Sequence, residues 1–297
     1  MSAPPSRDGV RAWMFLAPFA LVFAAFTLVP MLESVPLALQ QTYGPSERRA
    51  VGVRNFSHLL GDPLFWIATR NTLLYTLGSL LIQIPLAFVL ALALNAPRLR
   101  GRAIYRLVFF SPQLMGLVFA SVLGALVFEK RSGLVNRVLS GVMGDPSFVG
   151  IAWLQDHIIA TLIIISLWLY TGFNMIFFLA ALQNIDPELA EASELDGAGP
   201  LNRLRHVVLP SIRPVAMFVV VLSMIGSLQL FELPYVLLDG GSGPNNRGLT
   251  IIMYLYQNGF EHGDLGYASA IGWTLSAVLI ALGVMQLRVL SRRRLGP

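Results

Sequence analysis

Long apolar stretches alternate with short polar ones along almost the whole chain. Each stretch is too long for a strand and longer than a typical helix of a soluble core. Runs of 18 or more apolar residues are typical of membrane-spanning helices, because about 20 residues at 1.5 Å rise cross a hydrocarbon layer of about 30 Å. Six windows fit or nearly fit this length: Ala12–Leu32, Asn71–Pro97, Leu107–Phe128, Ile158–Ile185, Val215–Phe231 and Leu265–Leu287. We therefore predict an all-α integral membrane protein with six transmembrane helices.

Composition supports this interpretation. Of the 297 residues, 12% are charged, against about 25% in soluble domains, and the mean hydropathy is +0.67. The first window is too long for the apolar part of a cleavable signal peptide, and no small-residue cleavage site follows it, so we expect an uncleaved first span. The chain has no cysteine, which excludes disulfides and thiolate–metal sites.

Arginine is concentrated in the loops on one side of the predicted membrane. With six spans both termini lie on that side, together with the arginine-rich segments 98–106, 203–213 and 288–294. The positive-inside rule places them in the cytoplasm. The excess of Lys and Arg (21) over Asp and Glu (16) is then orienting charge, and no nucleic-acid partner is expected. We expect a cytoplasmic tail at 1–11, a transmembrane domain at 12–290 and a cytoplasmic tail at 291–297.

A charged segment, residues 186–210, lies between the fourth and fifth predicted spans. Its six charged side chains after Asp186 would cost on the order of 18 kcal/mol at mid-bilayer, so the segment lies outside the hydrocarbon. Asp186 is placed to cap a helix with Pro187 in its first position, and Gly197 is placed to end it in a left-handed conformation. A second helix is expected from Pro200. On these grounds alone, both a solvated connection and a docking element for another protein remain open.

Within this segment the run EASELDGAGPLNRLRHVVLP resembles the EAA loop of the inner-membrane subunits of binding-protein-dependent ABC importers. That loop reads E-A-A, then D-G-A three residues on, then an aromatic residue, an aliphatic residue and L-P. Here Ser193 stands for an alanine, Leu204 for the aromatic residue and Val207 for isoleucine. The residues that the resemblance implies for coupling to an ATPase are Glu191, Ala192, Asp196, Gly197, Ala198, Leu204, Leu209 and Pro210.

Five further blocks resemble carbohydrate permeases of the maltose and glycerol-phosphate type, so the resemblance extends over nearly the whole chain. They are RAWMFLAPFALVFAAFTLVPMLESV, FWIATRNTLLYT, RGRAIYRLVFFSPQLM, LLDGGSGPNN and YLYQNGFEHGDLGYASAIGWTL. The resemblance implies a multi-pass permease subunit of an ATP-driven importer in the bacterial inner membrane, forming half of the pathway for a sugar or related carbohydrate. The partners it implies are a second permease subunit, a homodimeric ATP-binding subunit, an extracytoplasmic solute-binding protein and membrane lipid.

The chain carries no motif for hydrolysing ATP. A phosphate-binding loop needs G-x-x-x-x-G-K-[ST], and the only lysine is Lys130, in FEKRSG. The four histidines are isolated from one another, and no H-E-x-x-H or G-x-S-x-G motif occurs. We therefore expect no enzymatic activity and no metal or cofactor in this chain, with ATP and Mg²⁺ bound by the partner subunit.

A sugar pathway needs hydrogen-bonding and aromatic groups inside the bundle. Candidates from the fourth, fifth and sixth predicted spans are Tyr170, Asn174, Ser227, Gln229, Glu232 and Trp273. For each of them the alternative is packing between helices or a place in the interfacial belt. The alternatives for the whole chain are an ion-coupled secondary transporter or channel, and an ABC permease for another solute such as a phosphodiester or a polyol.

Overall fold

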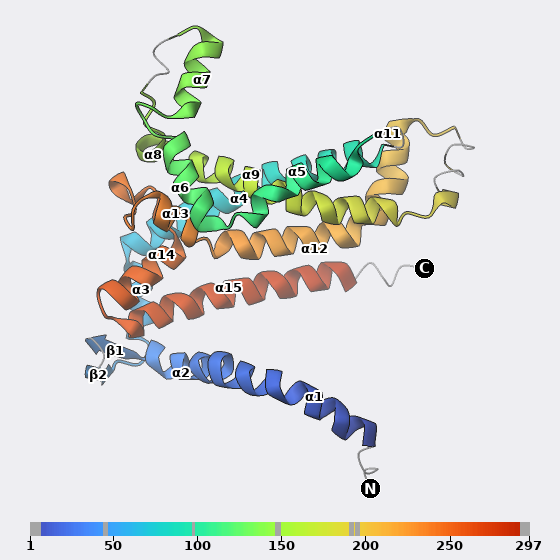
Figure 1. Ribbon diagram of the computed structural model, residues 1–297. Helices are drawn as coiled ribbons and strands as arrows, with labels where there is room; N and C mark the ends of the chain where they lie inside the picture. The colour runs from blue at the N-terminus through green and yellow to red at the C-terminus, as the bar shows by residue number, and fades with distance from the viewer. Residues whose placement is uncertain are drawn as a thin grey trace. The chain divides into compact units, whose positions relative to one another are not determined.

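The computed structural model describes residues 7–43, 47–96, 99–145, 150–189, 193 and 197–291. The chain divides into two compact units. Unit 1 comprises residues 1–62 with 255–277, and unit 2 comprises residues 63–254 with 278–297. Figure 1 shows the elements of both. The described part contains five helices long and apolar enough to cross a membrane, and a sixth span if one bent pair is counted. The predicted helical membrane fold is confirmed.

The long helices contain the predicted apolar windows, with shifted ends. The first span is α1 (Arg7–Phe23), the π-helical turn η1 (Ala24–Leu28) and α2 (Val29–Ala38). The others are α4 (Pro63–Asn95), α9 (Ile158–Gln183), α12 (Leu209–Leu228) and α15 (Leu265–Ser291). Helix α4 begins at the Asp62-Pro63 step, where proline suits the first helical position because it has no N–H to leave unpaired.

The third predicted span, Leu107–Phe128, is wrong as a single straight helix. It is a pair, α5 (Arg102–Leu114) and α6 (Leu117–Val127), bent by 94°. The break lies at Met115 and Gly116, and Gly116 has φ 78° and ψ 157°. This backbone region is almost restricted to glycine, and Pro112 in the preceding turn removes a helical hydrogen bond. The apolar sequence continues through the break, but the helix axis changes direction there.

The fifth predicted span, Val215–Phe231, also has different ends. Helix α11 (Pro200–Arg203), the π-helical turn η3 (Leu204–Val208) and α12 form one helical rod, so the second half of segment 186–210 extends the span. The π-helical turn lies just before Pro210, whose ring clashes with the carbonyl four residues back in a regular α-helix. The rod ends at Leu228, and after a break α13 (Glu232–Leu237) begins.

In unit 2, α4 and α9 pack along their length. Helix α5 packs on α9, α12 packs on both α4 and α9, and α13 packs on α6. The buried face of α4 repeats every three or four residues, which is the spacing of one helical stripe. Shorter elements cap one end: α7 (Leu134–Met143), α8 (Trp153–Asp156), the 3-10 turn η4 (Pro244–Asn246) and α14 (Ile251–Tyr256). We call this end of unit 2 the distal end, and the end with α11 the proximal end (Figure 1).

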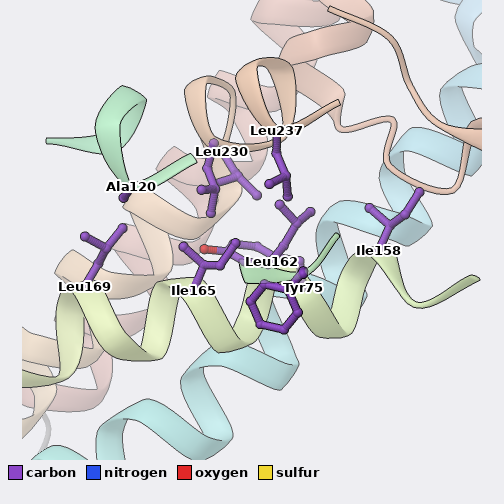
Figure 2. Packing of buried hydrophobic residues seen from close by; sticks show 10 residues of the cluster. Tyr75, Ala120, Ile158, Leu162, Ile165, Leu169, Leu230 and Leu237 are labelled. Carbon is purple, nitrogen blue, oxygen red and sulfur yellow. The ribbon is translucent and has the colours of Figure 1, made fainter. Parts of the chain in front are cut away.

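Two apolar clusters hold unit 2 together. The distal cluster joins residues of α4, α6, α9 and α13, as Figure 2 shows for Tyr75, Leu162 and Leu237. The proximal cluster joins Ala87 and Ala91 of α4 to residues of α9 and α12, including Met175 and Phe178. Between the clusters the interior is more polar.

Unit 1 contains an antiparallel hairpin that the all-α prediction missed. Strands β1 (Gln40–Tyr43) and β2 (Glu47–Ala50) pair with Gln40 opposite Ala50. Thr42 Oγ1 lies 3.2 Å from the carbonyl of Gly263, far along the chain. A short helix, α3 (Arg54–Gly61), follows the hairpin, and Asn55 donates hydrogen bonds to the carbonyls of Ala38 and Gln40. The π-helical turn η5 (Gln257–Glu261) completes the unit.

Candidate functional site

A polar stripe runs along the buried face of α4. Thr72, Thr76, Ser79 and Gln83 follow one another at helical spacing, and all are buried. One turn further the same face continues with Ala87 and Ala91, and is apolar. Polar side chains at this depth are costly unless they meet partners or line a cavity, so the stripe points to polar contacts inside the bundle.

The distal part of the stripe fixes the turn after α13. Asn71, which precedes Thr72, donates to the carbonyls of Asn246 and Leu249 at 2.8 and 3.0 Å. The hydroxyl of Thr72 accepts from the amide of Ile251 at 3.0 Å. This turn contains three non-glycine residues with positive φ, Asp239, Asn245 and Asn246. These contacts tie the distal turn to α4.

The proximal part of the stripe opens on a pocket of about 280 Å³. Four helices contribute to its walls: α4, α5, α9 and α12. Two broken spans meet there, since Gln113 lies just before the α5–α6 break and Leu230 lies in the break between α12 and α13. Broken helices are characteristic of solute sites near the middle of the membrane. The lining residues are Tyr75, Gln83, Gln113, Tyr170, Phe173, Asn174, Leu222, Ser223, Gly226, Ser227 and Leu230.

Hydrogen bonds between helices order several polar groups around the pocket. Tyr75 Oη and Ser166 Oγ lie 2.6 Å apart, joining α4 to α9. Asn174 Nδ2 donates to Ser223 Oγ at 3.1 Å, joining α9 to α12. Ser79 Oγ and Ser227 Oγ lie 3.3 Å apart. These bonds fix the walls while leaving polar and aromatic surface toward the cavity.

The pocket lies between the two apolar clusters. Tyr75 and Leu230 belong both to its lining and to the distal cluster, while Ala87, one turn beyond Gln83, belongs to the proximal cluster. Along α4 the pocket therefore lies between the distal and the proximal apolar cluster.

The predicted pathway residues fall into three groups. Tyr170, Asn174 and Ser227 meet in the pocket. Gln229 and Glu232 lie at the break after α12, where both are exposed, and neither lines the pocket. Trp273 belongs to unit 1, where its indole N–H donates to Ser34 Oγ at 3.1 Å. A role of any of the six in solute binding stays a prediction.

The coupling residues are described in part. Glu191, Ala192 and Asp196 lie outside the described residues. Gly197 has φ 74°, as expected for a left-handed helix end, and the amide of Ala198 donates to the carbonyl of Ser193 at 3.0 Å. At the start of the segment, Asp186 Oδ1 accepts from the amide of Glu188 at 2.9 Å.

The remaining coupling residues lie in the helical rod that continues into the membrane. Leu204 is in the π-helical turn η3, and Leu209 and Pro210 open α12. The same helical stretch carries Leu222, Ser223, Gly226 and Ser227 of the pocket wall.

Sequence reasoning missed the contribution of α4 and α5 to the pocket. Gln83 had a detectable signal, because it continues a polar stripe at helical spacing in an otherwise apolar helix. Gln113 has no such signal, since it reaches the pocket only because α5 and α6 diverge. In the described part of the chain, no group of three or more His, Asp or Glu residues is placed to hold a metal.

A polytopic helical bundle with two broken spans around a pocket that holds buried polar side chains is typical of a membrane transport protein. The family described as "Binding-protein-dependent transport system inner membrane component" matches residues 83–296. This chain belongs to that family.

Relatives of known role align over nearly the full length. The chain is 36% identical to the lactose transport system permease protein LacF of Rhizobium radiobacter, covering 96% of this chain and 95% of the relative. It is 34% identical to the arabinooligosaccharides transport system permease protein AraP of Bacillus subtilis, covering 93% and 87%. A crystal structure of a bacterial ABC transporter involved in the import of the acidic polysaccharide alginate contains a similar chain (TM-score 0.81, 25% identity), with coverage of 98% and 99%.

Proposed function

We propose that this chain is the permease subunit of an ATP-driven ABC importer for a carbohydrate, and that its pocket is part of the translocation pathway. The observation that carries the proposal is a pocket at two broken spans, between two apolar clusters and lined by aromatic and neutral polar side chains, in a chain of the binding-protein-dependent transport family. Tyrosine, phenylalanine and amide side chains suit a sugar, which offers hydroxyl groups and apolar ring faces. The names of the relatives support a carbohydrate.

The distal end is then extracytoplasmic, and the proximal end and both termini are cytoplasmic, as the distribution of arginine favours. An extracytoplasmic binding protein delivers the solute, and a second permease subunit supplies the other half of the pathway. Two copies of an ATP-binding subunit hydrolyse ATP, since this chain lacks a P-loop.

Segment 186–210 is the docking element for the ATP-binding subunit in this proposal. Its acidic first half and its continuous connection to α12 support this role. Gly197 is the sharpest point to test, because a side chain there meets no atom within 4 Å while its φ of 74° is strained for any L-residue. A substitution therefore changes the shape of the loop without a clash.

The experiment compares Gly197→Ala with Gly199→Ala in the intact transporter, measuring uptake of lactose and of an arabinooligosaccharide. Gly199 has an ordinary extended φ of −65° and also has open space around it. A left-handed alanine costs about 1–2 kcal/mol, so Gly197→Ala should uncouple ATP hydrolysis from uptake, and Gly199→Ala should behave as wild type. Equal behaviour of the two variants contradicts the docking role.

The same preparation tests the class of transporter. An ABC importer takes up its solute in an ATP-dependent, vanadate-sensitive manner without an ion gradient. Uptake that continues in vanadate and collapses with the ion gradient would instead assign the chain to the secondary transporters.

A further inference from the structure

Gln83 differs from the other buried polar side chains of the pocket. It lies on α4, is 4% exposed, and is part of the pocket lining. Tyr75, Asn174 and Ser227 each have a side-chain partner on another helix. Among the described residues, Gln83 has no such hydrogen bond. A buried amide that faces a cavity without a protein partner is expected to find one in what the cavity holds.

The position of Gln83 places its amide where a solute in the pocket would contact it. One turn toward the proximal end the same face of α4 meets the apolar cluster at Ala87, which is 0% exposed. Gln83 is therefore the last polar group of the stripe, at the floor of the pocket. A solute that reaches the floor of the pocket therefore meets the Gln83 amide before it meets the proximal cluster.

The chemistry of the lining narrows the solute. A glutamine side chain offers two N–H donors and a carbonyl acceptor, which matches a pair of neighbouring hydroxyl groups. Gln113 and Tyr170 add neutral polar groups, and among the described residues no Asp, Glu, Lys or Arg lines the pocket. A carboxylate or phosphate would find no cation there to offset its desolvation.

Building on the proposed function, we propose that Gln83 is a solute-recognition residue that hydrogen-bonds an uncharged carbohydrate at the floor of the pocket. Specificity for neutral sugars then arises partly in the permease, on α4, in addition to any selection by a binding protein. This assignment separates the chain from permeases for acidic oligosaccharides or phosphodiesters.

The absence of native cysteine gives a direct test, because a single substituted cysteine is the only thiol of the chain. Gln83→Cys is compared with Asn174→Cys, a second pocket position, and with Ala87→Cys, the buried neighbour in the proximal cluster. Each variant is assembled in the full transporter and treated with a small hydrophilic methanethiosulfonate reagent. Labelling of this chain is read by mass spectrometry, without added solute and with millimolar lactose, trehalose, arabinotriose or an alginate trisaccharide.

We expect labelling at positions 83 and 174 but not at 87, and protection of position 83 by at least one neutral sugar but not by the alginate trisaccharide. Position 83 as unreactive as 87 overturns the inference. Protection of position 174 by a sugar that leaves position 83 unprotected also overturns the inference, but that result is consistent with the proposed function. Protection by the acidic trisaccharide alone contradicts the neutral specificity. Protection of neither position by any sugar contradicts the carbohydrate function itself.

Transport kinetics provide a second measurement. Gln83→Leu keeps a side chain of similar size and removes the amide, so the half-saturation concentration for the protecting sugar should rise about 3- to 10-fold, the effect of one neutral hydrogen bond. Gln286→Leu is the matched control, because Gln286 donates to the carbonyl of Met217 at 2.8 Å outside the pocket. An unchanged half-saturation concentration in Gln83→Leu, or an equal rise in both variants, overturns the assignment.

Discussion

Gly172→Ala tests the close crossing of α5 and α9, which positions two walls of the pocket. A methyl group on Gly172 would fall on the carbonyl group of Phe109 and lie 3.0 Å from the amide nitrogen of Phe110. Both obstacles are backbone atoms, so no change of side-chain rotamer relieves the overlap. Helix α5 must move away from α9 by on the order of 1–2 Å before normal contact distances return.

The size of the effect follows from two opposing contributions. Overpacking of a close-packed interior costs typically 1–3 kcal/mol, and a clash against backbone belongs at the upper end, about 3 kcal/mol. Alanine is favoured over glycine within a helix by about 1 kcal/mol. The net loss is about 2 kcal/mol, which corresponds to a fall in the thermal midpoint of about 4–8 °C for a protein of this size.

The measurement is thermal unfolding of the purified protein in detergent, with Gly283→Ala on α15 as control. A side chain at Gly283 meets no atom within 4 Å, so only the gain in helix propensity applies and the midpoint should stay the same or rise. If Gly172→Ala and Gly283→Ala have the same midpoint, α5 and α9 are not in backbone contact and the reasoning is refuted.

Two further predictions concern the loop that connects α6 to α9 at the distal end. Asn136 is 1% exposed, donates to the carbonyls of Lys130 and Ile151, and accepts from the indole N–H of Trp153 at 2.7 Å. Asn136→Leu should therefore destabilise this loop by about 2–3 kcal/mol and speed its proteolysis. Cleavage of the variant at the wild-type rate would contradict this prediction. Hydrogen bonds from Ser132, together with that from the Arg131 amide, hold the pKa of Glu129 below its usual range. Its carboxylate therefore stabilises the loop above pH of about 4.3, and the effect is lost as the pH falls through the lowered pKa. The Ser132 amide should exchange faster in Glu129→Gln than in wild type at pH 7, and a difference that does not shrink as the pH is lowered would contradict the assignment.

Much of the fold follows from apolar run length. A window such as Ile158–Ile185 is long and apolar enough to require a bilayer, and α9 occupies all of it except the last two residues. The bend between α5 and α6 could not be predicted in this way, because hydropathy reports the surroundings of a residue and not the direction of the chain. The β1–β2 hairpin escaped notice because its strands are four residues long and polar, and Thr42 contacts the distant Gly263 and Asp264.

The candidate site was predicted unevenly for a similar reason. Tyr170, Asn174 and Ser227 stand out as polar residues in apolar spans, and they do line one pocket. Gln229 and Glu232 are also polar residues in an apolar stretch, but α12 ends at Leu228, and the two residues lie exposed beyond that end, outside the pocket lining. Gln83 could have been predicted only from the helical spacing that places it on the same face of α4 as Thr72 and Ser79.

Helix α4 also determines which parts of unit 2 move together. From Asn71 to Gln83 it is unbroken over twelve residues, about 18 Å, and its single internal proline, Pro85, lies just beyond the pocket floor. A helix lacking a hydrogen bond at proline flexes there more readily than elsewhere. If α4 bends at Pro85, the distal turn and Gln83 therefore move together as one segment relative to the proximal cluster, and the flexible point lies between Gln83 and Ala87.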